Sequence, residues 1–178
     1  GIPVPQCAVS VVACAFFFVQ GYTNIKTGSM ETVNTPKAIG IAFINDKRLI
    51  VDLAYNDLVT SGIDVLFRSE DIKDGISQLS ALKELPQICI IDLDFYDKNV
   101  LAQLQELRTL YPIIKLIGHS DIDAEKVVKS LLEMGFMGYL LIGSDVYDFK
   151  KAIEVVTNGG KYFSVGIAKF AQEYFTNN

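Results

Sequence analysis

The chain has 178 residues, of which 50% are hydrophobic and 21% are charged. This length gives room for one domain of ordinary size with a full core, and the composition excludes a disordered chain. A formal net charge of -5, without a cluster of Lys or Arg, argues against direct binding to the phosphates of a nucleic acid.

Cysteine and histidine are scarce and widely spaced. Cys7, Cys14 and Cys89 lack the paired spacing of a zinc site, and His119 is the only histidine of the chain. We therefore expect any bound metal to be a hard cation held by oxygen atoms. We also expect reduced thiols and a cytoplasmic location.

Residues 1–37 are predicted to be a leader outside the folded domain, either non-native or disordered. Residues 1–25 carry no Asp, Glu, Lys or Arg, but the apolar run is shorter than the roughly 20 residues of a membrane span and lacks the basic start of a signal peptide. The tripeptide Gly28-Ser29-Met30 looks like a protease-cleavage scar followed by a natural start. A genuine anchor and an added strand or partner-binding segment are the alternatives, and we expect no membrane partner.

From residue 38 onward, short apolar runs alternate with segments of helical periodicity. Because parallel strands need helical crossovers, the pattern predicts an α/β fold with a doubly wound parallel sheet of five strands and five helices. In chain order the predicted elements are a strand at 39–44, a helix at 49–59, a strand at 63–67, a helix at 72–85, a strand at 87–91, a helix at 98–110, a strand at 113–118, a helix at 124–134, a strand at 138–142 and a helix at 145–158.

Polar residues follow three of these strands. Asp46 closes the first, Asp92 closes the third and Ser120 comes just after the fourth. Ligands of open α/β sheets bind outside the carboxyl ends of the strands, so Asp92 is predicted to be a working residue. The alternative is that Asp46 and Asp92 only cap the helices that follow, and that Ser120 only begins a loop.

Residues 41–164 resemble the receiver domain of two-component response regulators. The resemblance is carried by Ile44-Asn45-Asp46, by Ile90-Ile91-Asp92-Leu93, by Ser120 and by Gly138-Tyr139-Leu140-Leu141, at the spacing of that family. It implies the flavodoxin-like strand order 2-1-3-4-5.

The resemblance implies that Asp92 is the phosphoacceptor, which receives a phosphoryl group from a sensor histidine kinase. It also implies a Mg²⁺ ion held by Asp46, Asp92, the backbone carbonyl of Asp94 and, weakly, the amide of Asn45. Because an amide brings no charge, we expect weaker Mg²⁺ binding than three carboxylates would give. The Asp94 side chain itself is expected to face solvent.

Ser120 corresponds to the residue that hydrogen-bonds the phosphoryl group, and Tyr139 to the switch aromatic, although a plain strand aromatic is an equal alternative. Ile142 stands where the family has a lysine, so a cationic contact to the phosphoryl group is missing. Asp121 adds bulk and negative charge beside Ser120. His119 is adjacent to Ser120, but neighbours in an extended segment point apart, so we do not expect the two to act together.

Residues 155–164 resemble the end of receiver domains in the LuxR/NarL-type branch, which carries a helix-turn-helix domain. We therefore divide the chain into the leader (1–37), the receiver domain (38–164) and a connector helix (165–178). DNA binding is expected only through a C-terminal domain absent from this chain. A homodimer is expected through the segment 124–134, the strand after it or the last helices.

These expectations define an atypical receiver domain, the regulatory part of a transcription regulator, and not an enzyme. One alternative is a pseudo-receiver that is never phosphorylated and acts by dimerisation or protein binding. A flavodoxin-like enzyme or nucleotide binder is disfavoured, because no glycine-rich phosphate loop follows the first strand.

Overall fold

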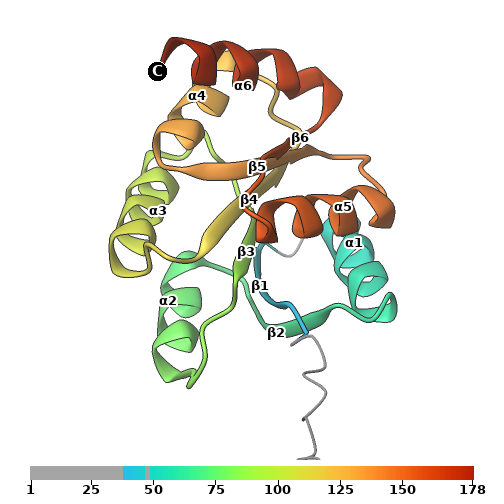
Figure 1. Cartoon of the computed structure of the whole chain (residues 1–178). Helices are drawn as coiled ribbons and strands as arrows, with labels where there is room; N and C mark the ends of the chain where they lie inside the picture. Colours follow the sequence, from blue (N-terminus) through green and yellow to red (C-terminus); the bar gives the residue numbers. More distant parts are fainter. Residues whose placement is uncertain (1–37, 47–48) are drawn as a thin grey trace, which may run out of the picture. The chain divides into compact units, whose positions relative to one another are not determined.

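The structure is a computed structural model that describes residues 38–46 and 49–178, in which strands and helices alternate (Figure 1). The predicted leader lies outside the described residues. The strands are β1 (Gly40–Asn45), β2 (Asp64–Ser69), β3 (Ile88–Asp92), β4 (Lys115–Ser120), β5 (Phe136–Leu141) and β6 (Tyr162–Phe163). The helices are α1 (Leu49–Thr60), α2 (Ile72–Ala81), α3 (Lys98–Leu110), α4 (Glu125–Glu133), α5 (Val146–Thr157) and α6 (Val165–Asn177).

The strands form one parallel sheet in the order β2-β1-β3-β4-β5-β6. The predicted doubly wound order 2-1-3-4-5 is confirmed, and β6 is an additional edge strand that the prediction missed. With two residues, β6 is too short to show the alternation that identifies a strand. It is held beside β5, where the backbone N–H of Ser164 donates to the carbonyl of Tyr139 at 3.0 Å.

Some boundaries differ from the prediction for local reasons. The fourth strand begins at Lys115 rather than at 113, because Ile114 still belongs to the turn after α3, where its N–H donates to the carbonyl of Tyr111 at 3.2 Å. The strand then extends to Ser120, so the last two residues of β4 are part of the sheet. The helix predicted over 72–85 ends at Ala81, since Leu82 is already extended.

Helices cover both faces of the sheet, with α1 and α5 on one side and α2, α3 and α4 on the other (Figure 1). Alternate residues of the central strands point to opposite faces. Each large side chain taken from water contributes roughly 1.5–3 kcal/mol, so both layers hold the sheet. The α1/α5 side buries Ile41, Phe43, Ile88, Ile90, Ile117 and Leu140, and the other side buries Ala42, Ile44, Cys89, Ile91, Leu116 and Tyr139.

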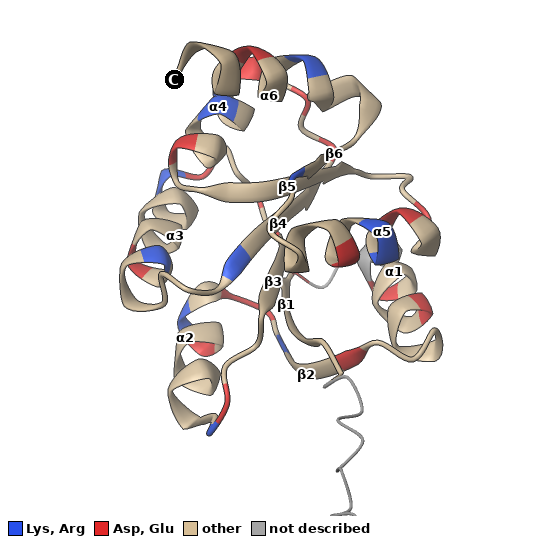
Figure 2. Cartoon of the chain, viewed as in Figure 1, with Lys and Arg blue, Asp and Glu red and all other residues tan. Residues whose placement is uncertain are grey.

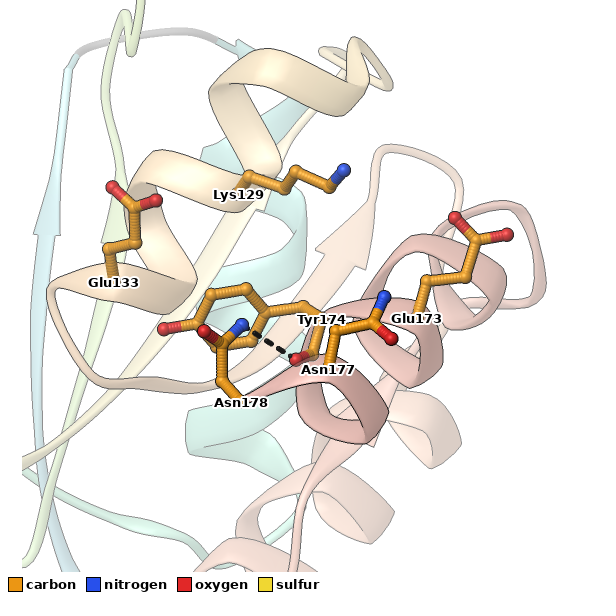
Figure 3. Close-up of a pocket in the computed structure, with 6 residues that line it drawn as sticks. All are labelled: Lys129, Glu133, Glu173, Tyr174, Asn177 and Asn178. Carbon is orange, nitrogen blue, oxygen red and sulfur yellow. Dashed lines mark hydrogen bonds between the residues drawn. The ribbon is translucent and has the colours of Figure 1, made fainter.

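The last helix, α6, packs against α4 and β6 of its own domain. Its Ile167 and Ala171 are buried, while Val165 at its start is 95% exposed. The apolar residues of this segment are therefore partly covered within the chain. A pocket of about 280 Å³ lies between the two helices, lined by Lys129, Glu133, Glu173, Tyr174, Asn177 and Asn178 (Figure 3).

Two general surface properties follow. None of the described helices is long and apolar enough to cross a membrane. In the described residues, Lys and Arg are dispersed over several helices and strand ends among Asp and Glu (Figure 2).

Candidate functional site

The carboxyl ends of β1, β3 and β4 bring four buried polar residues together. Asn45 is in register with Asp92, and the β3/β4 register places His119 beside Asp92. Asn45, Asp92, His119 and Ser120 are at most 2% exposed. The N–H of Asp46 donates to the carbonyl of Asp92 at 3.3 Å, which keeps the two acidic residues adjacent. The sequence-predicted residues of this edge are thus neighbours in the structure.

Asp92 is hydrogen-bonded to His119, a contact that the sequence analysis did not foresee. The atoms in contact are His119 Nδ1 and Asp92 Oδ2. The imidazole packs on Phe149 of α5, with ring centroids 4.9 Å apart. The expectation that His119 and Ser120 do not act together agrees with this geometry, because His119 turns toward the α1/α5 side. The alternation of side chains along β4 could have predicted this contact. It places His119 two residues after the buried Ile117, on the same face of the sheet and level with Asp92.

The amide of Asn45 is held by groups on both sides. Its Oδ1 accepts a hydrogen bond of 2.7 Å from Nε of Arg68, and its Nδ2 donates to the carbonyl of Asp46 at 2.7 Å. Arg68 also pairs with Asp52 and lies over the ring of Tyr55, with 4.6 Å from Cζ to the centroid. Because a guanidinium already occupies Asn45 Oδ1, this oxygen is poorly placed to bind a cation. Arg68 was not predicted from sequence, because it reaches the site only through the pairing of β2 with β1.

Asp94, whose backbone carbonyl is one of the expected metal ligands, lies in a turn after β3. Its carbonyl accepts from the N–H of Asp97 at 3.1 Å, and its exposed carboxylate accepts from the N–H of Tyr96 at 2.9 Å. Within residues 38–46 and 49–178, no group of three or more His, Cys, Asp or Glu side chains is arranged to hold a metal ion. Mg²⁺ binding stays a prediction, in which Asp46, Asp92 and the carbonyl of Asp94 would hold the ion, while the oxygen of Asn45 is engaged by Arg68.

Ser120 and Tyr139 lie on the opposite side of the sheet from His119. The Ser120 hydroxyl accepts from the N–H of Ile122 at 3.2 Å and donates to Asp121 at 3.4 Å. The buried Tyr139 hydroxyl donates to the carbonyl of Ile122 at 2.8 Å. Burial raises the pKa of Tyr139 above its ordinary value, and a hydrogen bond with Ser120 opposes this rise. The two residues are therefore coupled through the loop after β4, while Ser120 makes no direct bond to Asp92.

Gly118 allows Tyr139 to take this position. A Cβ atom at residue 118 would lie 2.7 Å from the ring of Tyr139. Because atoms cannot approach so closely, only glycine at this point of β4 lets the aromatic ring pack against the strand.

Ile142 lies at the start of the β5–α5 connection, where its N–H donates to the carbonyl of Ser120 at 3.0 Å. Together with Gly143, Ser144, His119 and Phe149 it contributes to a cavity of about 150 Å³. The resemblance implies a lysine at position 142, so this side of the cavity is apolar where a cationic side chain was expected. Ile142 therefore brings no charge to this position.

Comparisons with known proteins agree with this geometry. No family model matches the chain. The transcriptional regulatory protein DegU of Brevibacillus brevis is 29% identical over 133 residues, which cover 74% of this chain and 55% of DegU. The chain thus spans about half the length of this curated relative.

Solved structures with the same fold include a LuxR-family two-component response regulator from Aurantimonas sp. SI85-9A1, with a TM-score of 0.65, 20% identity, and coverage of 78% of this chain and 99% of that one. The isolated REC domain of RcsB from Salmonella enterica serovar Typhimurium, in the presence of the phosphomimetic BeF₃⁻, has a TM-score of 0.63 and 17% identity, and the match covers 75% of this chain and 98% of that one. A structure of two RcsB dimers bound to two parallel DNAs has a TM-score of 0.64 and 17% identity, and the match covers 76% of this chain and 68% of that one.

The parallel sheet, with Asp46 just after β1 and Asp92 at the end of β3, has the flavodoxin-like fold of the receiver domains compared above. In sequence the chain is similar to DegU, and in fold its described part is similar to the LuxR-family response regulator and to the receiver domain of RcsB.

Proposed function

We propose that Asp92 accepts a phosphoryl group from a sensor histidine kinase. The single observation that carries this proposal is the position of Asp92, which ends the central strand β3 in register with Asn45 and beside Asp46. Its fit to a receiver fold, one example of which was solved with a phosphomimetic anion, supports the same role. The domain would then be a signal relay with one acceptor, not a turnover enzyme.

In the proposed transfer, an oxygen of the Asp92 carboxylate attacks the phosphorus of the kinase phosphohistidine. A new O–P bond forms and the N–P bond breaks, while the departing imidazole nitrogen keeps the electron pair and takes up a proton. Such transfers depend on positioning and on neutralising charge around the phosphoryl oxygens. Ser120 is the proposed hydrogen-bond donor and Tyr139 the proposed switch aromatic, because Tyr139 contacts the loop that Ser120 begins.

Incubation of the full chain with acetyl phosphate and Mg²⁺ tests the proposal directly. We expect the intact mass to increase by one phosphoryl group, and we expect hydroxylamine to remove it because an acyl phosphate is labile to this nucleophile. Asp92→Asn should take up no phosphoryl group, while Asp94→Asn, at the exposed neighbour, should retain uptake. A wild-type protein that stays unmodified would count against the acceptor role.

A second candidate is a pseudo-receiver that acts by protein binding without phosphorylation. The observation in its favour is that Asp92 is buried and bonded to His119, while Ile142 brings no cation to the site. Unmodified wild type together with a stable complex between the chain and a partner would support this alternative.

We propose that the domain regulates transcription as part of a longer cytoplasmic protein. DegU is a transcriptional regulatory protein, and RcsB has been solved as dimers bound to DNA. By this analogy, contact with DNA would come through a further domain, and the receiver would control dimer formation.

A further inference from the structure

The acceptor carboxylate and the only histidine of the chain form a buried pair. Both side chains are enclosed, with Asp92 at 0% and His119 at 2% exposure. A carboxylate oxygen accepts hydrogen bonds and an imidazole nitrogen that carries a proton donates them, so the contact suits a proton on Nδ1. Oδ2 of Asp92 is occupied by this contact.

The surroundings hold the imidazole in this position. Phe149, itself buried, packs against one side of the ring. The other ring nitrogen, Nε2, is buried and has no hydrogen-bond partner among the described residues. The bond to Asp92 is thus the one hydrogen bond that the structure records for this side chain within residues 38–46 and 49–178. If this bond breaks, the imidazole loses the one hydrogen bond that it makes among the described residues. The ring should therefore stay bonded to Asp92 until another group takes the place of the carboxylate.

A receiver carboxylate needs both of its oxygens. In the proposed transfer one oxygen would bond to phosphorus, and the other would remain to help hold a charge-neutralising cation. In this chain the oxygen of Asn45 is bonded to Arg68, and Oδ2 of Asp92 is bonded to His119. A cation that binds Oδ2 of Asp92 would therefore have to displace His119 from this oxygen.

We propose that His119 is a positioning residue that holds Asp92 in a closed state and competes with a divalent cation for Oδ2. This inference rests on the proposed acceptor function of Asp92. The cavity of about 150 Å³ beside His119, bounded by Ile142 and Ser144, offers space for the imidazole once it leaves the carboxylate.

The variant His119→Leu tests the competition, because leucine removes the donor while filling much of the same space. A hydrogen bond to a charged group is worth about 1.5–3 kcal/mol, so we expect Mg²⁺ to bind roughly tenfold more tightly to the variant in isothermal titration of the full chain. The control Ser144→Ala alters the same cavity wall but does not touch Asp92, and should leave the Mg²⁺ affinity unchanged. Equal or weaker binding by folded His119→Leu overturns the proposal.

A second measurement needs no substitution. Because the chain has a single histidine, ¹⁵N-histidine labelling gives one imidazole spin system. We expect the proton on Nδ1 in the cation-free protein, and a change of the Nδ1 signal on saturation with Mg²⁺ and beryllofluoride. A signal that stays unchanged at saturation overturns the proposal even if His119→Leu fails to fold.

The two proposals fail in different ways. If His119→Leu binds Mg²⁺ more tightly but neither protein takes up a phosphoryl group from acetyl phosphate, the competition stands and the acceptor function is wrong. If both proteins are phosphorylated equally and bind Mg²⁺ equally, the acceptor function stands and the role of His119 is wrong.

Discussion

At the scale of single residues, the polar atoms at the carboxyl edge of the sheet are already engaged with one another. Asp92 is bonded to His119, and Asn45 to Arg68. Buried polar groups need partners, because an unsatisfied group in the interior costs about 1–3 kcal/mol. The partners that stabilise the domain are therefore the ones that a phosphoryl group and its cation would have to displace.

Restoring a cation beside the site should favour the phosphorylated form. We expect Ile142→Lys to bind beryllofluoride about tenfold more tightly than wild type, because a charge-assisted contact to a bound anion contributes about 1.5–3 kcal/mol. Ile142→Met extends the side chain without charge and should not increase affinity. Titration of the three proteins under identical Mg²⁺ decides the matter, and equal affinities for Lys and Met would show that the missing charge is not the cause.

At the scale of elements, α6 belongs to the fold and does not simply lead out of it. Ile167 is fully buried against the domain, and the N–H groups of Ile167 and Ala168 both donate to the carbonyl of Ser164, at 2.8 and 2.9 Å. The segment that was predicted as a connector helix thus begins with a turn anchored beside β6 and then packs on α4.

A cavity left at residue 167 should therefore weaken the whole domain. We expect Ile167→Ala to lower the free energy of unfolding by about 2–5 kcal/mol, the range for truncating a buried aliphatic side chain. Val165→Ala, in the same helix but 95% exposed, should change it by about 0.5 kcal/mol or less. Urea unfolding of both variants checks this, and similar small effects would mean that α6 detaches in solution.

At the scale of the whole molecule, the remaining exposed apolar groups bear on self-association. The expectation of a homodimer rested partly on the apolar C-terminal segment, and the packing of α6 on α4 now accounts for Ile167 and Ala171. On the surfaces that this expectation named, from α4 onward, the exposed large apolar side chains are Val165, Tyr147 and Phe175, at 95%, 68% and 39%. The dimer stays a prediction, and α5 is the surface that we now favour for it because Tyr147 lies there.

Light scattering of the chain beginning at Met30 tests the dimer. We expect twice the monomer mass at high micromolar concentration, and a shift toward monomer in Tyr147→Glu, because a charge in an apolar interface is costly. Tyr96→Glu places the same change on another exposed aromatic, after β3, and should leave the mass unchanged. A monomeric wild type would leave intramolecular packing of α6 as the full account of the apolar segment.

The amino-acid sequence alone determined the parallel α/β architecture, because short continuous apolar runs and the helical periodicity between them depend only on neighbours along the chain. It also placed Asp46 and Asp92 at one edge, since the carboxyl ends of parallel strands share it. The short β6 escaped detection because two residues carry no periodic signal.

Only the tertiary structure decided which groups meet at that edge. The contact of His119 with Asp92 and that of Arg68 with Asn45 join strands that are neighbours in space but distant in sequence. Their existence depends on strand register, and a shift of one residue would turn each side chain to the opposite face of the sheet. The packing of α6 on α4 depends in the same way on where the turn at Ser164 directs the last helix.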